Sequence, residues 1–197
     1  MKRQLLGNHQ NSWIWGTKAI AETIASGHWK ILELHLLENS SAPHLMEWEA
    51  WAHRHRIPCE RETAARLEQL CKARDHQGAI ALMGPFPYTP FPQLREGVEK
   101  GSRILVLDGV QDPFNLGAII RSAVAFGFDG ILCSTHNQVG VTSHVARSSV
   151  GLVNRIAICR VEDLSASVQE LKRCGVQLLT THQQGVCDVD QLSTNQA

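Results

Sequence analysis

The spacing of apolar positions predicts a mixture of helices and strands in the first half of the chain. Residues 17–26 carry apolar side chains at helical intervals and stop before Gly27, a residue type that commonly ends helices. Residues 31–37 alternate between apolar and polar side chains, as a half-buried strand does. The same criteria predict helices at residues 43–55 and 62–72 and a further strand at residues 78–83.

The second half has a more regular pattern, in which short apolar runs precede helical stretches. Residues 104–107 form an apolar run that ends at Asp108 and Gly109, the form of a buried parallel strand. Strands that alternate with helices are typical of a parallel α/β sheet. The predicted strands that follow are 131–133, 156–159 and 176–180, and the predicted helices are 115–126, 142–150 and 163–174.

A proline-rich stretch divides these two patterns. Between Gly84 and Ser102 there are four prolines, which exclude a helix interior or a central strand and favour an extended linker. All five tryptophans precede this stretch, so we expect the two halves to have different cores. The predicted division is a small α/β domain at 1–83, a linker at 84–102 and a parallel-sheet domain at 103–197.

Composition narrows the class of protein. In 197 residues, 43% are hydrophobic, which excludes a disordered chain, and no apolar run approaches the ~20 residues of a membrane helix. With no secretion signal, we expect a cytoplasmic protein. Nineteen basic and nineteen acidic residues argue against a general binder of polyanions and leave room for a local basic patch. The six cysteines form no C-x-x-C pair and are predicted to be reduced core thiols.

The segment with most chemical information is residues 107–121, LDGVQDPFNLGAIIR. It follows a predicted strand, and ligands of α/β sheets bind in loops at this position. The loop lacks G-x-G-x-x-G, so it is not a dinucleotide fingerprint. Asp112 and Pro113 are residue types that begin helices, and capping explains both.

Arg121 is less easily explained by local structure. A solvated helix face normally carries several lysines and glutamates. Here the face opposite the apolar one carries a single arginine among small residues, a pattern that suggests close approach by another chain or a ligand-bearing segment. Helical side chains lean toward the N-terminus, so Arg121 can reach toward Asn115. Two interpretations of Arg121 stay open, a functional role and a structural ion pair. The face consists of Gly117, Ala118, Arg121, Ser122 and Ala125.

The pattern N-x-G-x-x-x-R over residues 115–121, together with residues 107–113 before it, resembles the first motif of the SpoU (TrmH-type) RNA 2′-O-ribose methyltransferases. These enzymes belong to the SPOUT superfamily of knotted methyltransferases. The likeness continues through residues 121–131, and it covers most of the chain. Weaker similarities to the catalytic domain lie at residues 149–151 and 175–182, and similarities to the N-terminal RNA-substrate domain lie at residues 15–20 and 76–78.

The resemblance implies transfer of a methyl group from S-adenosylmethionine to a ribose 2′-hydroxyl of ribosomal or transfer RNA. It implies that Arg121 is the catalytic arginine and that Asn115 shapes the site. Because a guanidinium stays protonated, we expect Arg121 to bind the ribose and adjacent phosphate and to stabilise the developing alkoxide, while the RNA phosphate takes part in proton removal.

The family's later motifs, a glycine-acid segment and a final Ser-Leu-Asn run, are not found in this sequence. In the family they form the knot and most of the adenosine pocket. The resemblance therefore predicts a partial SPOUT-type domain without the knot-forming C-terminal segment, which binds S-adenosylmethionine poorly. Thr181 is the only cofactor contact that carries over. The family works as a homodimer, and its last helix supplies much of that interface, so dimerisation of this chain stays open.

Three other interpretations of the sequence are a non-catalytic RNA-binding protein, a different class of methyltransferase and a metal-binding protein. A non-catalytic RNA-binding remnant of such an enzyme stays open. A Rossmann-type methyltransferase is disfavoured by the missing glycine-rich loop. A metal site at His53 and His55 is disfavoured because two residues of spacing put them on different helix faces, so no metal site is predicted. Ser149 has no base near it in sequence, and Cys133 and Cys159 are expected in the core. The remnant's phosphate contacts would come from Lys18, Arg54, Arg56, Arg61, Lys72 and Arg74.

Overall fold

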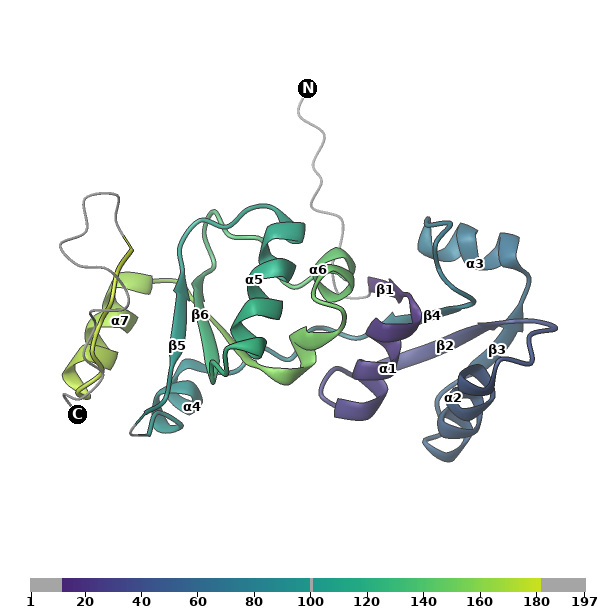
Figure 1. The fold of residues 1–197 in the computed structure, drawn as a ribbon, viewed down its shortest axis with the longest axis horizontal. Helices are drawn as coiled ribbons and strands as arrows, with labels where there is room; N and C mark the ends of the chain where they lie inside the picture. Colours follow the sequence, from purple (N-terminus) through teal and green to yellow (C-terminus); the bar gives the residue numbers. More distant parts are fainter. Residues whose placement is uncertain (1–11, 100, 182–197) are drawn as a thin grey trace, which may run out of the picture.

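A computed structural model describes residues 12–99 and 101–181, which form two β-sheets with flanking helices (Figure 1). The N-terminal sheet has four strands in the order β1-β4-β2-β3. Strand β4 is antiparallel to both of its neighbours, whereas β2 and β3 run parallel and leave β3 at one edge. The strands are β1 (Ser12–Trp15), β2 (Ile31–Leu37), β3 (Cys59–Glu62) and β4 (Ala79–Met83).

The three helices predicted in the first half are confirmed. They are α1 (Thr17–Ser26), α2 (Pro43–Arg54) and α3 (Ala64–Cys71). Gly27 ends α1 in the left-handed conformation, with φ 62°, and its backbone N–H donates to the carbonyl of Thr23. Thr63 caps α3, because its hydroxyl accepts from the backbone N–H of Arg66 at 3.2 Å.

The second half confirms the predicted parallel α/β arrangement. Its sheet has the order β5-β6-β7, and each adjacent pair is parallel. Helix α5 connects β5 to β6, and α6 with a short 3₁₀ helix, η1, connects β6 to β7 (Figure 1). The elements are β5 (Ile104–Leu107), α5 (Pro113–Ala125), β6 (Gly130–Ser134), α6 (Ser143–Ser148), η1 (Leu152–Arg155), β7 (Ala157–Val161) and α7 (Leu164–Arg173).

The predicted extended linker is wrong over part of its length, because it contains the helix α4 (Phe91–Glu96). Pro90 is the cap of this helix and Pro92 lies in its first turn, where a missing N–H costs no hydrogen bond. Leu94 is buried against β6 and β7 side chains, including Leu132 and Cys159. The prolines therefore begin a helix here instead of preventing one.

The predicted strand at 176–180 is also wrong, since these residues have no regular secondary structure. Gly175 takes φ 89° after α7 and turns the chain, and the N–H of Val176 donates back to Leu171. Leu178 and Leu179 are exposed. A strand needs a neighbour for its backbone groups, and the described sheet of β5, β6 and β7 provides none to this segment.

The two halves share one core, which corrects the expectation of different cores. A continuous cluster of buried side chains includes Ile20 of α1, Ile120 of α5 and Val153 of η1. A buried hydrogen bond reinforces it, from the side-chain amide of Asn154 to the hydroxyl of Thr23 at 3.0 Å. The N-terminal sheet is therefore packed firmly against the helices of the second half.

Three of the five described cysteines are buried as predicted, and Cys59 is half-buried. Cys71, Cys133 and Cys159 are buried, and burial raises the pKa of both Cys133 and Cys159 to about 11. Cys174 is exposed, which contradicts the prediction for that residue. Cys187 lies outside the described residues. No described helix is long and apolar enough to span a bilayer.

Candidate functional site

The loop between β5 and α5 is braced at both ends. The Asp112 carboxylate accepts from the backbone N–H groups of Phe114 and Asn115 at 2.6 and 3.0 Å, so its predicted capping role is confirmed. The N–H of Val110 donates to the side chain of Gln138 at 2.8 Å. These bonds fix the loop against the segment that follows β6, at the carboxyl end of the parallel sheet.

Gly117 is buried, unlike Ala118, Ser122 and Ala125 of the same predicted face. A Cβ atom at Gly117 would lie 1.8 Å from the Ser148 hydroxyl oxygen and 2.8 Å from the backbone nitrogen of Ser149. The close approach predicted from the sequence is therefore made, at this position, by α6 of the same chain. The prediction of another chain or a ligand-bearing segment is wrong for Gly117.

Arg121 lies on the exposed side of α5, together with Ala118, Ser122 and Ala125. No hydrogen bond or ion pair of Arg121 is found within residues 12–99 and 101–181. The alternative of a structural ion pair thus has no partner in the described part of the chain. Asn115 is also exposed, and six residues of helix separate it from Arg121 by about 9 Å along the axis.

A depression of 330 Å³ lies beside this face. Its lining is almost wholly apolar, and the exposed ring of Phe126 forms part of it. Arg121 does not line it. The lining residues are Leu105, Ala118, Ile119, Ser122, Ala123, Phe126 and Phe128.

Two other residues from the sequence analysis have clear placements. Thr181 is exposed at the end of the described chain and lines neither depression found near α5 and α6. Ser149 is completely buried, and its hydroxyl donates to Ala146 at 3.0 Å and accepts from Val153 at 3.3 Å. Ser149 therefore stabilises the turn after α6, and it is not placed as a nucleophile.

Two motifs that are distant in sequence meet at the joint between the halves. The backbone N–H and the hydroxyl of Thr17 both donate to the side-chain oxygen of Gln77, at 2.9 and 3.0 Å. The indole N–H of Trp15 donates to Asp75 at 3.1 Å. Arg147 of α6 forms an ion pair with the same Asp75, and its guanidinium lies 5.4 Å from the Trp15 ring centroid. The start of α1 and the loop before β4 are thereby connected to α6.

An aromatic row continues from this joint to α5. The ring of His144 lies 5.5 Å from Trp15 and 5.7 Å from Phe114, measured between centroids. Phe114 is exposed, and a depression of 430 Å³ opens beside Trp15 and His144. Its lining combines aromatic rings with one lysine, a combination suited to nucleic acid bases and phosphates. The lining residues are Ser12, Trp13, Trp15, Leu70, Cys71, Lys72, Ala73, Ser143 and His144.

The candidate phosphate contacts differ in their surroundings. Arg61 is held by the Glu49 carboxylate at 2.6 Å, and this hydrogen-bonded partner lowers the pKa of Glu49. Arg61 is therefore a structural residue, whereas the other five are exposed: Lys18, Arg54, Arg56, Lys72 and Arg74. His144 could not be identified from the sequence, because a single histidine in a short helix carries no periodic signal.

Comparisons with known proteins agree along the chain. The family described as "SpoU rRNA Methylase family" matches residues 102–196, and the one described as "RNA 2'-O ribose methyltransferase substrate binding" matches residues 13–89. A TrmH family tRNA/rRNA methyltransferase of Staphylococcus aureus (strain MSSA476) is 32% identical over 189 residues, which cover 94% of this chain and 75% of the relative. Its counterpart YacO of Bacillus subtilis (strain 168) is 29% identical, over 88% of this chain and 70% of the relative.

Solved structures share the fold. An AdoMet-bound rRNA methyltransferase from Sinorhizobium meliloti matches with a TM-score of 0.69 and 23% identity, covering 83% of this chain. The SpoU methyltransferase AviRb from Streptomyces viridochromogenes, in complex with AdoMet, matches with a TM-score of 0.67 and 21% identity, covering 87% of this chain. The chain spans 58% and 66% of the lengths of these two solved chains.

Proposed function

Since the chain belongs to the SpoU (TrmH-type) family of RNA methyltransferases, we propose that it takes part in methylation of a ribose 2′-hydroxyl in RNA, with S-adenosylmethionine as the methyl donor. The RNA is ribosomal or transfer RNA. Because its relatives in Staphylococcus aureus and Bacillus subtilis are bacterial tRNA/rRNA methyltransferases, the proposed place of action is the cytoplasm.

The observation that carries this proposal is the state of Arg121. Its guanidinium is exposed beside small side chains and has no partner in the described part of the chain. It is thus free to donate several N–H groups to an incoming ribose and phosphate. As the ribose hydroxyl loses its proton, the fixed positive charge stabilises the oxygen on which negative charge develops. Asn115, in the first turn of the same helix, shapes the approach to this position.

The proposed division of labour follows the two halves. Residues 1–83 hold the RNA, and residues 103–197 act on the ribose. Residues 84–102 connect these two parts. The depression of 430 Å³ at the joint supports this arrangement, because aromatic rings stack on unpaired bases and Lys72 attracts phosphate. The row Trp15, His144 and Phe114 leads from this depression to the start of α5.

The described residues do not by themselves form an enclosed site for the methyl donor around Thr181. This residue is exposed and lines neither depression. Thr181 as a contact of the methyl donor is implied by the family resemblance, whereas Arg121 and Asn115 are proposed to meet the RNA.

The test is transfer of labelled methyl groups from S-adenosylmethionine to RNA, with the modified nucleoside identified by mass spectrometry after digestion. Ribosomal and transfer RNA form separate arms. Because weak donor binding is expected, the assay uses excess S-adenosylmethionine. We expect slow formation of 2′-O-methylated nucleosides with the unchanged chain and with Arg173→Ala, an exposed arginine on α7, and none with Arg121→Ala. Calorimetric titration with S-adenosylmethionine accompanies the assay. RNA binding without donor binding or transfer would overturn the proposal and favour a non-catalytic RNA-binding protein.

A further inference from the structure

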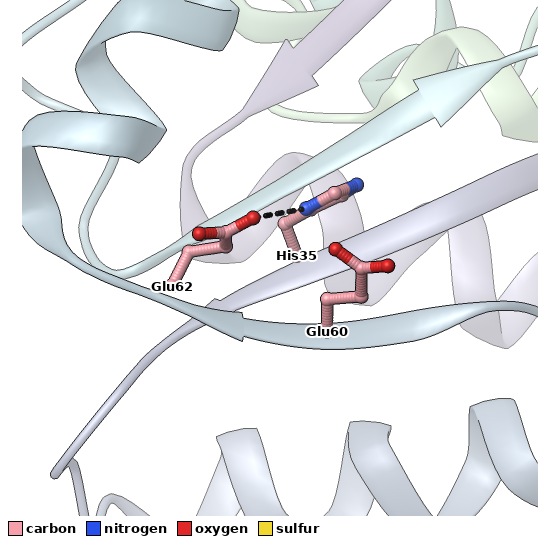
Figure 2. A group of neighbouring side chains, drawn as sticks. All are labelled: His35, Glu60 and Glu62. Carbon is pink, nitrogen blue, oxygen red and sulfur yellow. Dashed lines mark ion pairs between the residues drawn. The ribbon is translucent and has the colours of Figure 1, made fainter.

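A cluster of His35, Glu60 and Glu62 lies on the N-terminal sheet, away from α5 and α6, with Glu33 beside it. His35 comes from β2, and Glu60 and Glu62 come from the adjacent edge strand β3 (Figure 2). The parallel register places His35 opposite Glu60, and alternation puts Glu62 on the same face of the sheet. One ligand atom from each of these three side chains lies within 4.8 Å of the others.

The imidazole of His35 is nine-tenths buried and is oriented by its surroundings. Its Nε2 lies 3.3 Å from a carboxylate oxygen of Glu33, and the ring makes an edge contact with Trp13 at 5.2 Å. Since a carboxylate can only accept, Nε2–H donates to Glu33, and Nδ1 points to the other side of the ring. Nδ1 is completely inaccessible to solvent and makes no hydrogen bond with any residue in the described ranges.

What Nδ1 faces is another acceptor. The Oε1 atom of Glu62 lies 3.6 Å away, and Figure 2 shows the Glu62 carboxylate directed at the ring. A lone pair and a carboxylate oxygen repel each other unless a proton or a metal ion lies between them. Two ligands bound tetrahedrally to a metal at ~2.1 Å are about 3.4 Å apart, which is close to the observed separation.

We propose that His35, Glu60 and Glu62 bind a divalent transition-metal cation of the Zn²⁺ class, with Nδ1 and one oxygen from each glutamate as ligands. A hydrogen bond from the second ring nitrogen to a carboxylate is the usual support of a metal-bound histidine, and Glu33 provides it. Imidazole suits Zn²⁺ and its neighbours, whereas Mg²⁺ and Ca²⁺ prefer oxygen ligands alone. Glu60 is exposed, so its side chain is free to close onto the ion.

The bound ion would join β2 to the edge strand β3 and neutralise part of the charge of three neighbouring carboxylates. This inference is independent of the proposed methyl transfer. Residue spacing predicts no metal site here, because His35 is far in sequence from Glu60 and Glu62 and meets them only through the pairing of β2 with β3.

The experiment is calorimetric titration of the metal-stripped full chain with ZnCl₂, in a Cys174→Ser background that removes the exposed thiol. We expect one equivalent to bind and to raise the unfolding temperature. Glu60→Gln, a change at an exposed side chain, and Glu62→Gln should each weaken binding by more than tenfold. Loss of the supporting carboxylate in Glu33→Gln should weaken it by about 10–100-fold.

The matched control is His55→Gln, an exposed histidine whose ring stacks on Trp51 and which should leave affinity unchanged. Three results would overturn the proposal. They are the absence of saturable binding, binding that survives in both Glu60→Gln and Glu62→Gln, and a thiolate-to-metal absorption band in the Co²⁺-loaded chain.

Discussion

Replacement of Gly151 by alanine tests the packing between α1 and the turn after α6. Gly151 takes φ 83°, and an added Cβ would lie 2.6 Å from the Cβ of Glu22 and 3.1 Å from the Cα of Ala19. The left-handed conformation costs an alanine about 1–2 kcal/mol. Overpacking against a helix backbone adds roughly 1–3 kcal/mol, and the lower entropy of the unfolded alanine chain returns about 0.4–1 kcal/mol. The free energy of unfolding should therefore fall by about 2–4 kcal/mol.

The assay is urea unfolding followed by circular dichroism. With a slope of about 2 kcal/mol per molar urea, the midpoint of Gly151→Ala should fall by roughly 1–2 M. The matched control is Gly175→Ala, since Gly175 has φ 89° and no atom within 4 Å of its added Cβ. Gly175→Ala carries only the conformational cost, so its free energy of unfolding should fall by only about 1 kcal/mol. Equal losses in the two variants would refute the reasoning, because they would show that α1 does not crowd this position.

Three further predictions concern single groups. Thiol modification of the native chain at neutral pH should label Cys174 and spare Cys133 until unfolding, because burial raises the pKa of Cys133 to about 11; equal rates would contradict this burial. The pKa of Glu49 is lowered by its hydrogen bond with Arg61, so its stabilisation is present above the unfolded value near 4.5 and is lost as the pH falls through the folded value. Urea midpoints should thus fall less between pH 7 and pH 3 in Glu49→Gln than in the unchanged chain, and an equal fall would refute the link. Methyl transfer should be at least tenfold slower in Arg121→Lys, because an ammonium cannot form a two-pronged contact; full activity would exclude that contact.

Helices and strands that are determined by their own local sequence were predicted correctly. Helix α1 ends where Gly27 adopts a conformation that other residues avoid, and Asp112 caps α5 as its residue type indicates. The parallel sheet of the second half follows from apolar runs that are separated by helical patterns. These signals are local, and they do not depend on where the rest of the chain lies.

Elements that depend on a partner were not predicted. Strand β3 consists of Cys59–Glu62, with three charged residues, and it is a strand because β2 pairs with it. The reverse holds at residues 176–180, where an apolar run finds no neighbouring strand in the described sheet and stays irregular. In both cases the presence of a neighbouring strand, and not the β-propensity of the residues, determines whether a strand forms.

The residues of the candidate sites also fall into two groups, those on one element and those brought together by the fold. Asn115 and Arg121 lie on one helix, so a motif could identify them, although only the structure shows that Arg121 has no described partner. His35 and Glu60 are far apart in sequence and become neighbours through the register of β2 and β3. His144 reaches Trp15 only because α6 packs on the first half. These groupings require the topology, which residue spacing does not contain.

The charges of β3 have a consequence for self-association. This strand is the last of its sheet, and the edge of a sheet is a template for pairing with another molecule. A second copy that added its own β3 there would bring Glu60 and Glu62 against the same residues, so like charges would repel along the new pair. The glutamates thus disfavour pairing between copies of the chain at this edge. A cation held by them would lower that repulsion, and the solubility of the protein would then depend on the ions around it.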